Sequence, residues 1–273
     1  MSEFGSQMFG LQGKHALVTG GTQGVGAAIA KGIAAAGADL VLVGLADDDA
    51  ARQTKRECEE FGVQCHVLCC DLSQCPDDYV DQLVADATGL LPKISLLVNN
   101  AGTYIDKPYL EMDFATYQKT MQLNVAAGYF LTQAFAKRWV ESSVDGRVVF
   151  TGSINGMLAE PDHSAYDTSK GAVAAMVKSL CVSLAPKGIR VNAMAPGLVR
   201  TPLTDVLNQD ARLDQWMKLH TPNGQVPGPD VCAGAAVFLL SDAAAHVHGQ
   251  TILVDGGMSS WQQPDPPADW MQG

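Results

Sequence analysis

The sequence has few charged residues, no long apolar run and no excess of positive charge. Only 17% of its 273 residues are charged and 47% are apolar, which excludes the composition of a disordered chain. No stretch approaches the roughly 18 consecutive apolar residues that a membrane-spanning helix requires. The net charge of −11 would repel phosphate backbones and anionic lipids, which disfavours nucleic acids and membranes as partners. We therefore expect a folded globular protein.

The N-terminus also lacks the basic segment and apolar core of a secretory signal. The seven cysteines are an odd number with no C-x-x-C pair, which favours reduced thiols over a disulfide framework or a zinc site. Both observations indicate a cytoplasmic protein without a bound metal. Residues 1–7 are expected to be vector-derived, with Met8 as the natural start.

Short apolar runs alternate with longer Ala-rich stretches of helical period, which predicts parallel strands joined by helices. The runs are apolar throughout, as is typical of strands covered on both faces. The expected strands are His15–Thr19, Leu40–Val43, Cys65–Cys70, Ile94–Val98, Arg147–Thr151, Arg190–Ala193 and Thr251–Val254. The expected helices are Gly24–Ala36, Asp48–Phe61, Asp77–Ala87, Phe114–Glu141 with a break near Asn124, Ala165–Ala185 and Asp230–Leu240.

No repeat and no linker rich in Pro, Gly or Ser divides the chain. Residues 8–258 are therefore expected to form one α/β domain, a doubly wound Rossmann fold with a seven-stranded parallel sheet. Residues from about 200 to 229 hold several prolines and a short helical stretch, which is typical of a substrate loop. The tail, residues 259–273, is rich in proline and tryptophan and is expected to pack against this subunit or a neighbour.

A glycine-rich loop follows the first expected strand and leads directly into a helix. Its sequence is Thr19-Gly20-Gly21-Thr22-Gln23-Gly24-Val25-Gly26. Glycines permit positive φ angles and a close backbone approach, and the first amides of a helix form an anion site suited to a pyrophosphate. The spacing G-x-x-x-G-x-G differs from the common G-x-G-x-x-G, so the loop alone could also be an ordinary glycine-rich turn.

Tyr166 and Lys170 lie four residues apart in a segment of helical period, so their side chains share one face. A free tyrosine, with a pKa of about 10, is a poor base at neutral pH. A nearby ammonium and the positive charge of an oxidised nicotinamide would favour its phenolate. These two residues alone are more often a surface pair on a helix.

Together these motifs resemble those of the short-chain dehydrogenases/reductases. The resemblance runs from about Leu11 to Met258, and five motifs in the same order are far more specific than any one of them. The matching segments are the T-G-x-x-x-G-x-G loop Thr19–Gly26, the N-N-A-G segment Asn99–Gly102, the Y-x-x-x-K pair Tyr166 and Lys170, and Pro196-Gly197 with Thr201. Asn124 and Ser153 occupy the positions of the family's catalytic asparagine and serine.

The resemblance implies hydride transfer between a nicotinamide cofactor and a secondary alcohol or ketone, with Tyr166 exchanging the proton. It implies that Ser153 bonds the substrate oxygen, that Lys170 binds the nicotinamide ribose, and that Asn124 holds a water linking Lys170 to solvent. The implied cofactor contacts are Gly20, Thr22, Gln23, Gly24, Val25, Gly26, Leu45, Asp71, Leu72, Asn99, Ala101, Gly102, Tyr166, Lys170, Pro196, Gly197, Val199 and Thr201. The expected substrate contacts are Ser153, Asn155, His163, Tyr166 and Leu198.

The end of the second expected strand bears on the choice of cofactor. Gly44-Leu45-Ala46 occupies the discriminating turn, followed by Asp47, Asp48 and Asp49. Clustered carboxylates disfavour a 2′-phosphate, so NAD is favoured over NADP, although the aspartates could instead simply begin a helix. Asp71 resembles the family's adenine contact but could equally cap the next segment.

Asn155 and His163 could bond hydroxyls, which favours a sugar, a polyol or a small cyclic alcohol as substrate. His163 could also be a solvated loop residue. The alternatives are a 3-oxoacyl-type ketone reductase, a non-catalytic dinucleotide-binding sensor or scaffold, and a sugar-nucleotide epimerase or dehydratase. The retained Tyr166 and Lys170 argue against the sensor, and the short C-terminal part argues against the epimerase. The resemblance also implies a homodimer or homotetramer.

Overall fold

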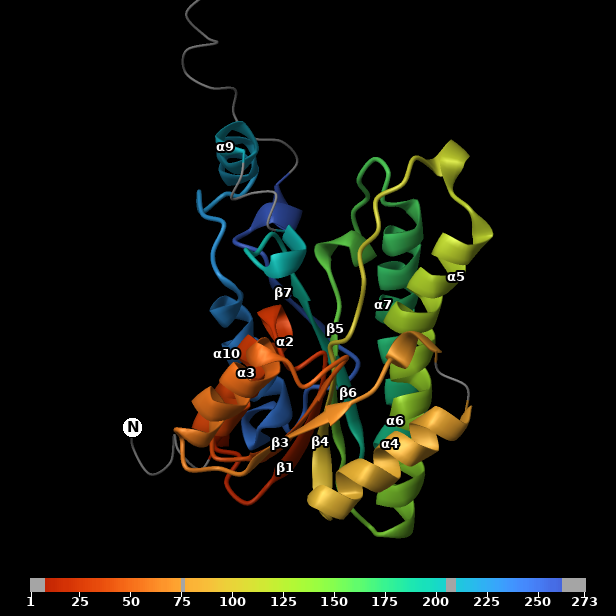
Figure 1. Cartoon of the computed structure of the whole chain (residues 1–273), viewed down its shortest axis with the longest axis vertical. Coiled ribbons are helices and arrows are strands. Elements are labelled where there is room, and N and C mark those ends of the chain that lie inside the picture. Colours follow the sequence, from red (N-terminus) through yellow and green to blue (C-terminus); the bar gives the residue numbers. More distant parts are fainter. Residues whose placement is uncertain (1–7, 75–76, 205–209, 262–273) are drawn as a thin grey trace, which may run out of the picture.

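The structure is a computed structural model that describes residues 8–74, 77–204 and 210–261 (Figure 1). The segment expected to be vector-derived and most of the tail lie outside the described residues. Within this part of the chain, all strands belong to one sheet and helices cover both of its faces.

The sheet is parallel throughout and contains seven strands. They are β1 His15–Thr19, β2 Asp39–Gly44, β3 Cys65–Cys69, β4 Ile94–Asn99, β5 Arg147–Thr151, β6 Arg190–Pro196 and β7 Thr251–Val254. Their order is β3-β2-β1-β4-β5-β6-β7, so the direction in which the sheet grows reverses between β1 and β4. Ligands of doubly wound folds bind at the carboxyl ends of the strands beside such a reversal.

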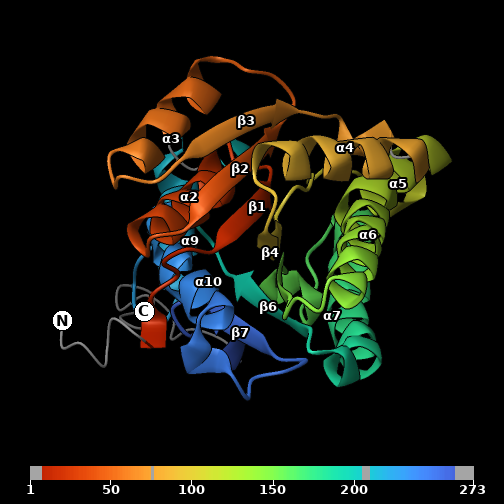
Figure 2. The same ribbon diagram turned by 90° about the horizontal axis from the view of Figure 1, so that it is seen from below.

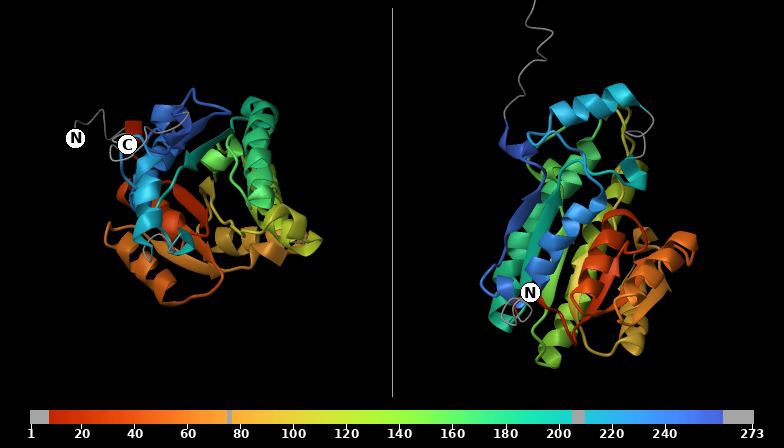
Figure 3. Two further views of the ribbon diagram at one scale, coloured as in Figure 1. Left: turned by 90° about the horizontal axis from the view of Figure 1, so that it is seen from above. Right: turned by 90° about the vertical axis from the view of Figure 1, so that its left-hand side faces the viewer.

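The helices form two layers, as the view from below shows (Figure 2). They are α2 Gly24–Ala35, α3 Asp49–Glu59, α4 Asp77–Leu90, α5 Phe114–Met121, α6 Ala127–Glu141, α7 Ser164–Leu184, α9 Ala211–Leu219 and α10 Ala233–Leu240. Helices α2, α3 and α10 cover one face, and α4, α6 and α7 cover the other. Helix α9 lies beyond the end of the sheet, within the segment expected to form a substrate loop (Figure 3).

The inner strands are mostly apolar because both of their faces are buried, whereas the edge strands β3 and β7 are more exposed. Leu17 of β1 packs in the core beneath α4, α6 and α7, whereas its neighbours Ala16 and Val18 pack in the core beneath α2 and α10. All six residues of β4 and all seven of β6 are buried. The predicted parallel sheet with helices on both faces is confirmed.

The break expected near Asn124 takes the form of a wider turn. Residues Gln122–Ala126 form a π-helix between α5 and α6, so the chain stays helical across the position. A π-helix inserts an extra residue into the turn and is frequent at functional sites. The buried side chain of Asn124 belongs to this turn.

Several predicted boundaries were wrong. The last helix was expected to begin at Asp230, but Pro229–Cys232 forms a 3₁₀ turn and α10 begins at Ala233. Pro229 is the first residue of that turn, where its missing N–H is tolerated. Strand β6 continues past Ala193 to Pro196, because its last residues pair with β7. Strand β3 ends at Cys69, before the expected Cys70.

Candidate active site

The glycine loop after β1 forms a tight cradle at the start of α2. Gly20 and Gly24 have φ angles of 59° and 56°, a region that side chains rarely adopt. A Cβ on Gly26 would stand 2.0 Å from the carbonyl oxygen of Gly20, so only glycine fits there. Gln23 precedes the helix and its side chain forms no capping bond. The first amides of α2 are thus suited to an external anion, and the loop fits a pyrophosphate.

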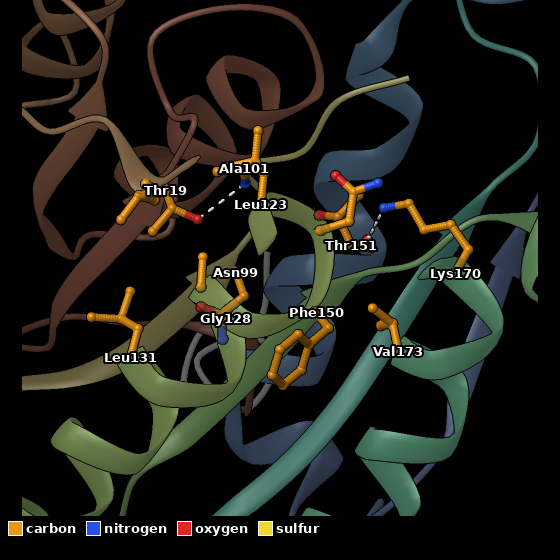
Figure 4. A pocket seen from close by; sticks show the side chains of 13 residues that line it. Thr19, Asn99, Ala101, Leu123, Gly128, Leu131, Phe150, Thr151, Lys170 and Val173 are labelled. Carbon is orange, nitrogen blue, oxygen red and sulfur yellow. Dashed lines mark hydrogen bonds between the residues drawn. The ribbon is translucent and has the colours of Figure 1, made fainter. Parts of the chain in front are cut away.

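Hydrogen bonds join the carboxyl ends of β1, β4 and β5. The Thr19 hydroxyl accepts from the amides of Asn100 and Ala101, each at 3.0 Å, the second of which is drawn in Figure 4. The Asn100 side-chain amide donates to the carbonyls of Thr19 and Gly20, both at 3.1 Å. The Thr151 hydroxyl donates to Asn100 Oδ1 at 3.1 Å. Thr19, Asn100 and Thr151 were not among the expected site residues, although the first two lie in matched motifs.

Lys170 reaches from α7 toward the end of β5 (Figure 4). Its ammonium donates to the carbonyl of Thr151 at 3.0 Å and lies 5.5 Å from the centre of the Tyr166 ring. The side chain is buried, with the residue only 7% exposed. Burial disfavours the charged form and lowers the pKa of Lys170 to about 8.

Burial raises the pKa of the Tyr166 phenol above its ordinary value. The polar hydroxyl of Ser153 lowers this pKa, whereas the carboxylates of Asp167 and Glu160 raise it further. In the protein alone, Tyr166 is therefore held as a neutral phenol. Ser153 Oγ also accepts from the amide of Asn155 at 3.1 Å, which fixes the serine at the start of a short turn.

The Asn124 side chain joins the loop after β4 to α7. Its Nδ2 donates to the carbonyl of Thr103 and to Ser169 Oγ, both at 2.9 Å, and its Oδ1 accepts from the amide of Thr103 at 2.7 Å. Ser169 Oγ in turn donates to the carbonyl of Tyr166 at 2.7 Å. Both ends of the Asn124 side chain are therefore engaged by the protein. Ser169 was not expected from the sequence, although it stands next to Lys170.

A cavity of about 10 Å³ lies beside Lys170 and Asn124 (Figure 4). It is lined by polar residues such as Thr19, Asn99 and Thr151, together with apolar side chains of α6 and β5. A cavity of this volume has room for about one water molecule. A larger cavity of about 390 Å³ lies at the end of β7 and includes Leu198 in its lining.

The expected substrate contacts Asn155 and His163 already have protein partners. Asn155 Nδ2 donates to Glu160 Oε2 at 3.0 Å and to Asp167 Oδ1 at 2.8 Å. His163 Nε2 lies 2.7 Å from the hydroxyl of Tyr104 and 2.8 Å from Asp106 Oδ1. Their roles as substrate contacts stay predictions. Tyr104, Asp106 and Glu160 were not among the expected site residues; their nearness in sequence to the N-N-A-G segment and to Tyr166 was the available signal.

The remaining expected cofactor residues fall around the same strand ends. Thr201 lies opposite the loop, with its Cβ 3.7 Å from where a Cβ on Gly24 would stand. Asp71 accepts from the amide and hydroxyl of Ser73, as a residue that caps the turn Leu72–Gln74 would. Leu45 is 77% exposed at the end of β2. Leu72 follows β3, Tyr166 and Lys170 lie in α7, and the other positions lie at the ends of β1, β4 and β6 or just after them. Their roles as cofactor contacts stay predictions.

Within residues 8–74, 77–204 and 210–261, no group of three or more His, Cys, Asp or Glu side chains is placed to hold a metal ion. Over these same residues, none of the helices combines the length and apolar character needed to span a membrane.

Residues 20–259 match the family described as enoyl-(acyl carrier protein) reductase. The chain is 31% identical over 248 residues to a 3-oxoacyl-[acyl-carrier-protein] reductase of Aquifex aeolicus, covering 91% of this chain and 98% of the relative. It belongs to the short-chain dehydrogenase/reductase family. It is thus an oxidoreductase that acts on CH–OH groups with a nicotinamide cofactor.

Two further relatives of this short-chain dehydrogenase/reductase carry names that specify a substrate. A galactitol 2-dehydrogenase (L-tagatose-forming) of Cereibacter sphaeroides is 34% identical over 258 residues, covering 93% of this chain and 98% of the relative. The crystal structure of a gluconate 5-dehydrogenase from Burkholderia cenocepacia, in complex with NADP and tartrate, superimposes with a TM-score of 0.87. That structure is 31% identical and covers 94% of this chain and 99% of its own.

Replacement of Gly26 by Ala tests the cradle. The added Cβ would meet the Gly20 carbonyl at 2.0 Å, so the loop must open. We expect the affinity for NADH, measured by fluorescence titration, to fall by at least about tenfold, the equivalent of about 1.4 kcal/mol. Gly89→Ala on α4 is the matched control, because nothing lies within 4 Å of its added Cβ. Equal NADH affinity in both variants would contradict the proposal that the glycine loop binds the cofactor.

Replacement of Lys170 by Met tests the cost of the buried ammonium. Burial lowers the pKa of Lys170 from 10.5 to about 8. Between pH 8 and pH 10.5 the unfolded chain therefore binds more protons than the folded chain, so the free energy of unfolding rises with pH. At about 1.4 kcal/mol per pKa unit, the buried charge costs about 3 kcal/mol at pH 7. We expect Lys170→Met to melt at a higher temperature than the wild type at pH 7. The difference should largely vanish at pH 10, and a difference independent of pH would contradict this explanation.

Proposed function

We propose that this chain interconverts a secondary alcohol of a sugar, polyol or small cyclic alcohol with its ketone, with NAD as the preferred cofactor. When bound, the cofactor would supply the hydride acceptor or donor. The observation that carries the proposal is the burial of Lys170 beneath the Tyr166 ring at the carboxyl end of β5, beside the glycine cradle.

Tyr166 is the proton acceptor for the alcohol hydroxyl. Burial alone keeps its phenol protonated, so ionisation requires positive charge nearby. The Lys170 ammonium, 5.5 Å from the ring centre, provides part of that charge. The hydroxyl of Ser153, which lowers the pKa of the phenol, is placed to bond the same substrate oxygen. In ketone reduction these residues return the proton along the same path.

The proton taken by Tyr166 needs a route away from a buried site. Lys170 faces the phenol on one side and the small polar cavity on the other. Asn124 lines that cavity, whose volume of about 10 Å³ suits one water molecule. This arrangement supports a relay from Tyr166 through Lys170 to a water near Asn124.

The names of the relatives support a sugar or polyol as substrate, since one acts on galactitol and one on gluconate. A second candidate is a 3-oxoacyl-type ketone reductase, which the relative from Aquifex aeolicus favours. Both substrates react at a secondary alcohol or ketone. A panel of polyols, cyclic alcohols and 3-oxoacyl thioesters, assayed with both cofactors, separates the two.

We also propose that the protein acts in the cytoplasm as a homodimer or homotetramer. Large apolar side chains lie exposed on neighbouring helices, including Phe114 of α5 and Tyr129 and Phe130 of α6. The rings of Tyr129 and Phe130 have centroids 5.2 Å apart, and exposed apolar side chains of this kind support a subunit contact on these helices.

Replacement of Tyr166 by Phe removes only the hydroxyl that exchanges the proton. We expect kcat to fall by about 100- to 10,000-fold, the usual contribution of a general acid or base. The affinity for NADH should stay near that of the wild type. Tyr79→Phe is the matched control, because Tyr79 is an exposed residue of α4. A Tyr166→Phe enzyme with wild-type kcat would contradict the proposed role.

The preference for NAD rests on the carboxylates that follow β2. Asp48 caps α3 by accepting from the amide of Ala51 at 2.9 Å. The nearby cation Arg52 bonds the carbonyl of Asp47 and, at 2.9 Å, Asp49 Oδ1. Its charge is therefore already paired with this acidic turn, which would repel the 2′-phosphate of NADP.

We expect kcat/KM to be higher with NAD than with NADP. Asp47→Asn removes one repulsive charge and should raise kcat/KM for NADP by about fivefold to tenfold while changing that for NAD less. The control is Asp86→Asn, which lies on α4. A wild-type preference for NADP would overturn the proposed choice.

A further inference from the structure

Tyr104 contacts the proposed catalytic tyrosine directly. The rings of Tyr104 and Tyr166 meet edge to face, with centroids 5.3 Å apart and an interplanar angle of 85°. Aromatic pairs prefer this geometry, and it contributes beyond the burial of their surfaces. Tyr104 follows the N-N-A-G segment by two residues, so the loop after β4 brings it to the start of α7.

Polar partners fix the position of Tyr104 on its other side. Its hydroxyl lies 2.7 Å from His163 Nε2, and the rings of these two residues also meet edge to face at 4.8 Å. His163 Nε2 is in turn 2.8 Å from Asp106 Oδ1, and its Nδ1 is 3.2 Å from Glu160 Oε2. Tyr104 is therefore held between the Tyr166 ring and a histidine whose Nε2 also contacts the carboxylate of Asp106.

We propose that Tyr104 is a positioning residue, which holds the Tyr166 ring in the orientation needed for proton transfer, and that His163 acts on Tyr166 only through Tyr104. This inference rests on the proposed role of Tyr166 as the proton acceptor. It gives His163 a role as a support of the site, in place of a direct contact with substrate.

The two phenols have different surroundings, which suits different roles. Burial and the neighbouring Asp106 both raise the pKa of the Tyr104 phenol well above its usual range. Tyr104 therefore stays neutral over the pH range in which enzymes work. Tyr166 instead faces Lys170 and the hydroxyl of Ser153, both of which favour the phenolate. Only Tyr166 is placed to ionise, and the neutral Tyr104 ring packs against it and holds its position.

The test compares Tyr104→Leu, which removes the ring, with Tyr104→Phe, which keeps it. A small displacement of a catalytic group can cost on the order of 100-fold in rate, and we expect a loss of this order in kcat for Tyr104→Leu. Tyr104→Phe should stay within about threefold of wild type, because its ring keeps the edge-to-face contacts with both Tyr166 and His163 and loses only the hydroxyl contact with His163, whereas His163→Ala removes both. KM and NADH affinity should change little in both, and only Tyr104→Leu should lower the melting temperature, since it removes the ring contacts. The matched control is Tyr109→Leu, a residue of the same loop that is 76% exposed.

A double-mutant cycle tests the role of His163. His163→Ala should lower kcat in the wild-type background and have no further effect in the Tyr104→Leu background, because its action passes through Tyr104. Additive losses would overturn this part of the proposal.

Other outcomes would overturn the positioning role itself. A rise in KM at constant kcat would show that Tyr104 binds substrate, and equal losses in Tyr104→Leu and Tyr104→Phe would assign the effect to the hydroxyl. A parallel fall in NADH affinity and melting temperature would indicate a general structural role. Tyr166→Phe is assayed beside these variants. If it is inactive while Tyr104→Leu is fully active, the positioning role fails and the proposed function stands; if it is active, the proposed function fails.

Discussion

The site depends on the row of hydrogen bonds that crosses the carboxyl ends of β1, β4 and β5. Asn100 stands at its centre, bonded to the backbone of β1 and to the hydroxyl of Thr151. The Thr151 carbonyl then accepts the bond from Lys170. Because each partner comes from a different strand, the cradle and the Tyr166–Lys170 pair have a fixed separation. Preorganised groups of this kind lower the cost of reaching a reactive geometry.

The burial of Lys170 is unfavourable for folding and useful for the proposed chemistry. Among the described residues its ammonium has a backbone carbonyl as its hydrogen-bond acceptor and no carboxylate in an ion pair. A partner carboxylate would stabilise the charge but would also cancel the field that favours a phenolate at Tyr166. Functional sites commonly retain such destabilising groups at the expense of stability.

The sequence was sufficient for the fold, because strands and helices follow from local patterns, whereas the expected site residues came from the resemblance to a family. Apolar runs and glycine spacing predicted the parallel sheet and the cradle. Side-chain orientation and long-range pairing were not accessible in this way. The contact between Tyr104 and Tyr166 joins the loop after β4 to helix α7, 62 residues further along the chain, and no periodicity marks it. Likewise, the sequence placed a break at Asn124, but only tertiary bonds to Thr103 and Ser169 explain why the helix widens there.

The π-helical turn between α5 and α6 also sets the angular phase of the two helices. Each residue of an α-helix advances the side-chain direction by about 100°, so one inserted residue rotates everything that follows by about that angle. With this offset, Thr120 of α5 and Leu131 and Phe135 of α6 are all buried. If the turn were one residue shorter, α6 would be rotated relative to α5, and part of the apolar face of one of these helices would be exposed. The register of a long helix and the placement of a single buried amide are thus fixed by the same insertion.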